Sequence, residues 1–172
     1  MLVCVDESGF ELLPARVRTW APQGKTPVLR VPYLHEHLTV ISGITPEGRL
    51  FQQVLDHGVR GVDCVRFLWH LLRHIEGKLL VVWDGLPAHR GQVVRTFLGT
   101  QFGKRVHLEA FPAYAPDLNP DEGVWKHLKY VELANECCRT LDELRRKLRL
   151  AMERLRQKPE VIIGCFRQCG FV

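Results

Sequence analysis

Short runs of apolar residues mark the strands of this chain. Residues 2–6 (LVCVD) form an apolar run that ends in a carboxylate, and such a run predicts a buried strand. Residues 38–43 and 49–56 flank a Thr-Pro-Glu-Gly turn, which predicts a hairpin. Residues 78–85 (KLLVVWDG) are too continuously apolar to leave one face in water, so this strand should be central in its sheet. Residues 106–112 predict one more strand.

A longer segment, residues 10–29, separates the first strand from the hairpin. We expect it to contain a short second strand and then an irregular excursion around Trp20, because Pro and Gly recur there. Its "GKT" resembles a phosphate-binding loop, but Thr19 stands where that motif needs a glycine and Pro27 follows directly. The segment is therefore not a nucleotide-binding P-loop.

Apolar residues at helical spacing predict the helices. Residues 62–75 carry an apolar face and are followed by Gly77, which predicts a helix that ends there. Further helices are expected over residues 88–102, from about residue 120, and after the capping box formed by Thr140 and Glu143. The inward positions of that last long helix are Leu141, Leu144, Leu148, Ala151 and Leu155. The order of elements predicts an α/β sandwich around a mixed sheet.

Length and composition favour one soluble domain. The chain has 172 residues, of which 46% are apolar and 25% charged, values that are ordinary for a globular protein. It has no apolar run long enough for a membrane span, and its N-terminus lacks the basic start of a secretory signal. We therefore expect a cytoplasmic protein without a membrane partner. Its six cysteines form no CxxC pair, which favours reduced, mostly buried thiols.

Positive charge gathers near the C-terminus. The formal net charge is +5, and residues 139–158 alone hold eight Lys or Arg against three Asp or Glu. Such a basic stripe is typical of a protein that binds a phosphate backbone, although a solvated helix face without a partner would look the same. The residues that we expect to contact such a backbone are Arg90, Lys126, Lys129, Arg145 and Arg149.

Three carboxylates fall at comparable points of the predicted fold. Asp6 ends the first strand, Asp84 ends the central strand, and Glu122 opens a helix. If the two strands are neighbours, the three side chains meet, and such a cluster needs a cation to neutralise it. Oxygen ligands favour Mg²⁺ or Mn²⁺, and two such ions about 3.5–4 Å apart would suit phosphoryl chemistry.

Each acid also has a reading that needs no metal. Asp6 fits a turn at a strand end, with Glu7 merely solvated beside it, and Asp84 fits an Asp-Gly turn. Glu122 fits the third position of a helix whose N-cap is Asn119. Other catalytic patterns fail earlier. His70 and His74 lack the glutamate of a metalloprotease, His35-x-His37 lies elsewhere in the chain, and no G-x-S-x-G motif occurs.

Four blocks of sequence resemble one known family. They are VDESGF at 5–10, TWAPQGKTP at 19–27, VVWDGLPAHR at 81–90 and FPAYAPDLNPDEGVWKHLK at 111–129. Together they look like the catalytic domain of DDE transposases of the mariner superfamily, most of all its bacterial insertion-sequence branch. The resemblance covers residues 2–155.

The resemblance implies a ribonuclease H-like fold with a five-stranded mixed sheet and a metal triad of Asp6, Asp84 and Glu122. It assigns His89 and Asn119 supporting roles. One departure is Gly85, where many relatives carry Asn, a possible hydrogen-bonding neighbour of the metal ligands. Residues 1–172 would form a single catalytic domain without the N-terminal helix-turn-helix modules of such transposases, which a separate upstream polypeptide or a fused reading frame would then supply.

The function that the resemblance implies is Mg²⁺-dependent cleavage and transfer of DNA strands at the ends of an insertion element. The partners would be double-stranded DNA and a second copy of the chain, in the bacterial cytoplasm near the nucleoid. Two alternatives stay open. One is a non-catalytic DNA-binding or assembly remnant of a transposase, and the other is a plain ribonuclease H-like nuclease.

Overall fold

A mixed five-stranded sheet forms the centre of the protein, as the sequence predicts. The computed structural model describes residues 1–29, 36–112 and 115–171, and its strands run in the order β3-β2-β1-β4-β5. β1 pairs antiparallel with β2 and parallel with β4, so it is the strand where the sheet changes direction. The strands are β1 (Leu2–Glu11), β2 (His37–Ile44), β3 (Leu50–Leu55), β4 (Leu79–Trp83) and β5 (Val106–Ala110).

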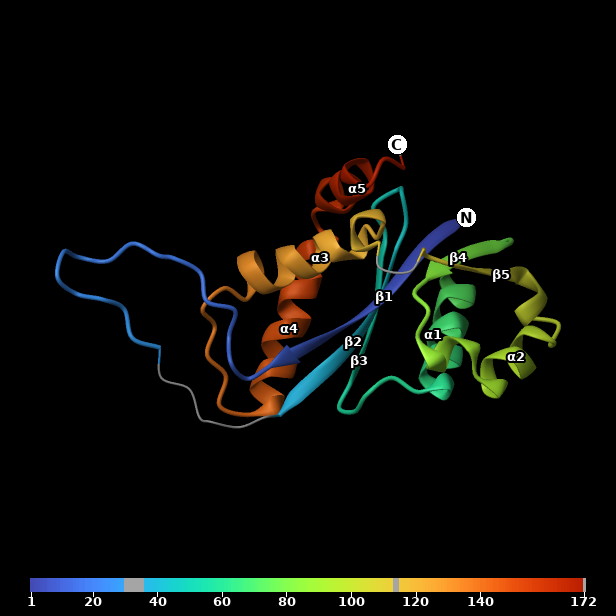
Figure 1. Ribbon diagram of the computed structural model, residues 1–172, viewed down its shortest axis with the longest axis horizontal. Coiled ribbons are helices and arrows are strands. Elements are labelled where there is room, and N and C mark those ends of the chain that lie inside the picture. The colour runs from blue at the N-terminus through green and yellow to red at the C-terminus, as the bar shows by residue number, and fades with distance from the viewer. Residues whose placement is uncertain (30–35, 113–114, 172) are drawn as a thin grey trace.

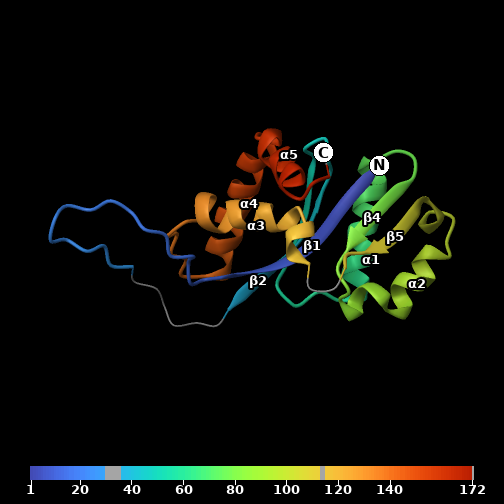
Figure 2. The ribbon, with the colours of Figure 1, turned by 45° about the horizontal axis from the view of Figure 1, so that its top comes forward.

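Helices cover both faces of this sheet (Figures 1 and 2). Side chains alternate along β1, so that Val3 and Val5 pack in one core with helices α1 and α2, while Cys4 and Phe10 pack in a second core with α3, α4 and α5. None of the helices in the described part of the chain is long and apolar enough to cross a membrane. The helices are α1 (Gly61–His74), α2 (Gln92–Leu98), α3 (Asp121–His127), α4 (Leu141–Arg156) and α5 (Pro159–Gln168).

Shorter helical turns connect these elements. η1 (Pro87–Arg90) follows β4, η2 (Gly103–Arg105) precedes β5, and η3 (Pro116–Leu118) precedes α3. The π-helical segment η4 (Leu128–Glu132) continues α3. The predicted helix over 88–102 is therefore wrong in extent, because η1 and α2 are separate elements and Gly91 stands between them in an extended conformation. The predicted helices at α1 and α4 are confirmed.

Two predictions about the strands among residues 2–29 are wrong. β1 does not end at Asp6 but continues to Glu11, because β2 pairs with it along that whole length. No short second strand forms among residues 12–29. Pro14, Pro22 and Pro27 fall in this stretch, and proline has no N–H to give to a strand ladder.

Instead, residues 12–29 leave the sheet as an arm that projects from the body of the protein, drawn in blue in both views (Figures 1 and 2). Asn135 holds its base: the Val17 N–H donates to Asn135 Oδ1 at 2.9 Å, and Asn135 Nδ2 donates to the Val17 carbonyl at 3.0 Å. Asn135 adopts a φ of 58°, a conformation that Asn tolerates better than most residues. Further out, Trp20 is completely exposed.

α3 and α5 approach each other closely at Gly123. A Cβ atom placed on Gly123 would lie 2.5 Å from Cys165 Sγ and 3.1 Å from Cys165 Cβ. Gly164, on α5, has open space where its Cβ would stand. The two helical glycines thus differ in what an added methyl group would meet.

We predict that Gly123→Ala destabilises the protein by about 1–3 kcal/mol, because the methyl group forces α5 away from α3. Gly164→Ala is the matched control, and it should be neutral or stabilising by up to about 1 kcal/mol since alanine favours a helix. Urea unfolding followed by circular dichroism measures both. Equal effects of the two substitutions would contradict this account of the α3–α5 contact.

Candidate metal centre

The register of β1 and β4 brings Asp6 and Asp84 to the same level of the sheet. Their parallel pairing sets Cys4 opposite Val82, and each acid lies two residues further along the chain. β4 ends at Trp83, so Asp84 follows a strand end as predicted, whereas Asp6 lies in the middle of β1. Asp6 pairs with Ser42 of β2 on its other side.

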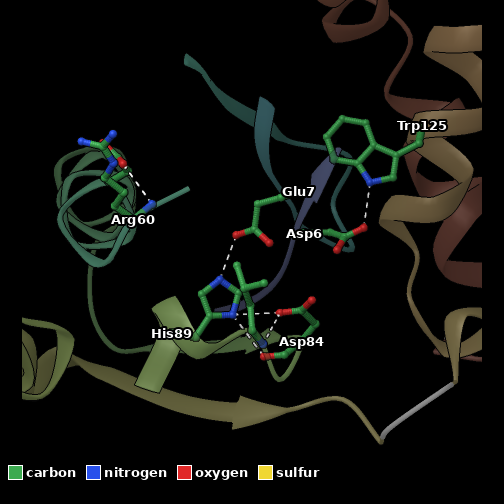
Figure 3. A network of polar contacts seen from close by, with 8 residues as sticks. Asp6, Glu7, Arg60, Asp84, His89 and Trp125 are labelled. Carbon is green, nitrogen blue, oxygen red and sulfur yellow. Dashed lines mark hydrogen bonds and ion pairs between the residues drawn. The ribbon is translucent and has the colours of Figure 1, made fainter. Parts of the chain in front are cut away.

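Asp6 is partly buried and fixed by one strong hydrogen bond. Trp125 Nε1 of α3 donates to Asp6 Oδ2 at 2.7 Å (Figure 3). Burial raises the pKa of Asp6 to about 6, with help from the neighbouring carboxylates Glu7 and Glu122 and against the opposing effect of the Trp125 hydrogen bond. A carboxyl group whose pKa is raised by other acids is one that a cation would stabilise in its ionised form.

Glu122 reaches the same place from the first turn of α3. The loop before it is fixed by η3 and by Asn119, whose side-chain oxygen accepts the Asp121 N–H at 3.2 Å. The Asn119 side chain satisfies a backbone donor at the start of the helix, but the predicted N-cap at Asn119 is wrong. Pro120 is the N-cap and the helix begins at Asp121, so that Glu122 is its second residue rather than its third. The hydrogen bond from the Asp121 N–H to Asn119 is compatible with a Glu122 side chain that faces the cavity, because the two features involve different side chains.

The three predicted acids line one cavity of about 340 Å³, together with Gly85, Phe111 and Asn119. Oxygen-only ligands of this kind suit Mg²⁺ or Mn²⁺. The ligand atoms of Asp6, Asp84 and Glu122 do not all lie within 4.8 Å of one another, a separation that among the described residues is met by Glu7, Asp84 and His89. The structure thus gathers the three carboxylates around one space, and their role as metal ligands stays a prediction.

The group of Glu7, Asp84 and His89 is a chain of hydrogen bonds. His89 Nε2 lies 2.8 Å from Glu7 Oε1, and His89 Nδ1 lies 3.0 Å from Asp84 Oδ1 and 3.1 Å from the Asp84 carbonyl oxygen (Figure 3). The two ring nitrogens point in opposite directions, so the two carboxylates flank the ring on opposite edges. These three residues form a described group whose ligand atoms lie close enough together to hold one metal ion, but here both ring nitrogens contact the two carboxylates.

His89 is buried and carries a perturbed pKa. Its ring stacks on Trp83 with centroids 4.1 Å apart and an interplanar angle of 6°. Burial by itself would lower the pKa of His89, but the Cys64 thiol, Glu7 and the Asp84 carbonyl together raise it to about 10. With both nitrogens facing oxygen acceptors, the ring is held as a doubly protonated imidazolium.

Sequence reasoning missed two acids near this centre. Glu7 entered the sequence analysis only as a solvated residue in the metal-free reading of Asp6, yet its side chain is only 11% exposed and pairs with His89. Its place on β1 shares the face of Val3 and Val5, which was the available signal. Asp121 is completely buried, and its position in α3, three and four residues before Val124 and Trp125, lies on the apolar face. Burial and the nearby Asp6 raise the pKa of Asp121 well above its usual range.

The comparison with protein families decides the membership of this chain. The family model described as "DDE superfamily endonuclease" matches residues 1–145. The chain belongs to the DDE superfamily endonucleases. Among curated protein sequences, none matches it.

Solved structures show that this family member shares the fold of the Mos1 mariner transposase. The Mos1 strand transfer complex matches with a TM-score of 0.65 and 18% identity, over 98% of this chain and 54% of that chain. The paired-end complex with Mg matches with a TM-score of 0.64 and 20% identity, over 98% and 55%. The isolated Mos1 catalytic domain gives 0.61 and 16%, over 98% and 82%. This chain thus spans about half the length of the Mos1 chains in the complexes.

The Lys and Arg side chains that we expect to contact DNA lie in different surroundings in this endonuclease fold. Arg90 donates to the Gly85 carbonyl at 2.7 Å, beside the cavity. Lys129 donates to Ser8 Oγ at 2.7 Å and lies over the Phe10 ring, so it also stabilises the fold. Arg145 and Arg149 project from the exposed face of α4. Lys126 lines a second cavity that Glu122 also borders. Their contacts with DNA stay predictions.

We predict that Asp6→Asn removes a pH-dependent loss of stability in metal-free buffer. The pKa of Asp6 is about 6 in the folded protein against an ordinary 3.8, so the folded state binds this proton more tightly than the unfolded state. Wild-type stability should therefore fall as the pH rises from about 4 to about 6, by up to about 3 kcal/mol.

Urea unfolding at a series of pH values in the presence of a chelator measures this effect. The Asn variant should match the wild type near pH 4 and exceed it above pH 6, since an amide keeps an acceptor for Trp125 but carries no charge. Parallel pH profiles of the two proteins would show that Asp6 has an ordinary pKa.

Proposed function

We propose that this chain is the catalytic domain of a transposase that cleaves and joins DNA strands with the help of divalent cations. One observation carries the proposal: in a member of the DDE superfamily endonucleases, the carboxylates of Asp6, Asp84 and Glu122 line a single cavity. Bound there, one or two Mg²⁺ or Mn²⁺ ions would lower the pKa of water and stabilise negative charge on a phosphodiester.

The roles of the residues follow from their positions. Asp6, held by Trp125, Asp84 at the end of β4 and Glu122 at the start of α3 would hold the cations. Phosphodiester hydrolysis at the element end breaks one P–O bond and frees a 3′-hydroxyl. That hydroxyl then attacks a phosphodiester of the target, forming one P–O bond for each that breaks, so no covalent protein intermediate is needed. Arg90, beside the cavity, would stabilise charge at the reacting phosphate.

The proposal includes DNA as substrate and a homodimer as the working form. The Mos1 structures that share this fold are named as paired-end and strand transfer complexes, and the basic, exposed face of α4 supports a phosphate-backbone partner here. The arm with its exposed Trp20 offers a surface for a second copy. Recognition of element ends would come from helix-turn-helix modules on an upstream or fused polypeptide, as the resemblance implies.

We predict that Asp84→Asn reduces Mn²⁺-dependent nicking of supercoiled plasmid by at least about 10³-fold, because the reacting centre would then lack one of its ligands. The melting temperature in metal-free buffer should be unchanged or higher, since one of several crowded charges is removed. Asp56→Asn is the control, because Asp56 is an exposed acid at the end of β3.

Two outcomes would contradict the assignment. A variant that nicks DNA at the wild-type rate would remove Asp84 from the reaction. A wild-type protein that binds DNA but never nicks it with Mg²⁺ or Mn²⁺ would favour the non-catalytic remnant, which Gly85 in place of the usual Asn also favours.

We predict that the double substitution Arg145→Ala and Arg149→Ala weakens binding to duplexes of any sequence. The slope of log affinity against log salt should become shallower by about 1 for each phosphate group that the variant no longer neutralises. Fluorescence anisotropy at several salt concentrations measures this. The control is the pair Arg66→Ala and Arg73→Ala on α1, which covers the opposite face of the sheet. Equal weakening in the control would show that the effect is one of net charge.

A further inference from the structure

Asp6 and Glu7 are consecutive residues of β1 that point to opposite faces of the sheet. Asp6 turns toward α3 and accepts the Trp125 hydrogen bond, whereas Glu7 turns toward η1 and contacts His89 (Figure 3). The cavity that holds the three predicted metal ligands is lined by Asp6 and Asp84, while neither Glu7 nor His89 belongs to its described lining. Glu7 therefore lies behind this cavity.

We infer that Glu7 is a positioning residue, which fixes the Asp84 carboxylate through the His89 ring. This inference rests on the proposed function, because it concerns how a predicted metal ligand is held. Glu7 does not touch the reacting atoms in this scheme. Glu7 orients the His89 ring, and the ring in turn orients the Asp84 carboxylate.

The ring of His89 has little freedom to turn. Glu7 Oε1 holds one edge at 2.8 Å, the Asp84 carbonyl and carboxylate hold the other edge at 3.1 and 3.0 Å, and Trp83 covers one face at 4.1 Å. The His89 side chain is fully buried and that of Glu7 almost so. A ring clamped on both edges keeps its Nδ1 aimed at Asp84, which is how partners of a metal ligand act in metalloproteins.

The contacts also determine which oxygen of Asp84 is free. The Leu86 N–H donates to Asp84 Oδ1 at 2.8 Å, and His89 Nδ1 approaches the same oxygen. Among the described residues, every hydrogen bond or ion pair to this carboxylate goes to Oδ1. The oxygen left for a cation is therefore Oδ2, and its direction depends on the donors that hold Oδ1.

The contact between Glu7 and His89 also links β1 to η1 and so could serve stability alone. The test must therefore distinguish an effect on the position of the Asp84 carboxylate from an effect on the stability of the fold. Glu7→Asp keeps the charge but shortens the side chain by one bond of about 1.5 Å, so it no longer reaches His89. Glu7→Gln keeps the length and removes the charge, and its amide oxygen can still accept from His89 Nε2. Glu11→Asp, at an exposed position of the same strand, is the matched control.

The affinity for Mn²⁺ is measured by calorimetry, with melting temperature in metal-free buffer and plasmid nicking beside it. We expect Glu7→Asp to lower the affinity about 10–100-fold while the melting temperature stays close to that of the wild type. Glu7→Gln should keep most of the affinity, and Glu11→Asp all of it. Nicking should follow affinity and recover at high Mn²⁺ in the Glu7→Asp variant.

The overturning results are distinct. Wild-type Mn²⁺ affinity in Glu7→Asp would show that the contact between Glu7 and His89 only links β1 to η1. A decrease in Glu7→Gln as large as that in Glu7→Asp would show that keeping the length of the side chain does not preserve the site, and it would overturn the inference that the hydrogen bond of Glu7 positions Asp84. If the wild type binds Mn²⁺ and Asp84→Asn does not, these results concern the inference alone. A wild type that binds no Mn²⁺ would overturn the proposed function, and the inference with it.

Discussion

The parallel pairing of β1 with β4 is the constraint on which the candidate metal centre depends. It sets Asp6 and Asp84 at one level of the sheet, because each lies two residues beyond the last paired position, Cys4 and Val82. β4 then stops at Trp83 while β1 continues, which frees the chain after β4 to turn into η1. A register change of one residue would move Asp6 to the other face and separate the acids.

Carboxylates that lie close together repel one another and destabilise the folded state, and each acid here has different surroundings. Trp125 holds Asp6, the Leu86 N–H and His89 hold Asp84, and complete burial raises the pKa of Asp121 well above its usual range. The remaining charge faces the cavity, where water or a cation can balance it. The arrangement fits a centre that binds cations, because strand register and helix placement bring the carboxylates together. Their proximity does not depend on the rotamers that individual side chains adopt.

The two layers of helices bring different residues to the two faces of β1. The layer of α3 brings Glu122 and Trp125 to the ligand side, while η1, on the layer of α1, brings His89 and its contact with Glu7 to the rear. The base of the arm is tied to Asn135, after α3 and η4. In the proposed function, these separate surfaces would serve cations, DNA and a second copy of the chain.

Sequence alone determined most of the elements and indicated the three acids as candidates. Strand and helix periodicity is a local property, so β1, the β2–β3 hairpin, α1, β4, β5 and α4 could be predicted, and strand ends pointed to Asp84. The length of β1 could not, because it depends on pairing with β2, a contact across the arm. The break at Gly91 was missed because helix propensity is continuous across it.

The tertiary structure alone decided what lies around the acids. For Glu7 and Asp121 the sequence shows only a place on an apolar face, and their burial follows from which helix covers which face of the sheet. The contact of Glu7 with His89 joins residues 82 positions apart, so no local pattern encodes it. Burial and charge–charge interaction are set by distances in space, whereas the sequence determines only which side of its own strand or helix a residue occupies.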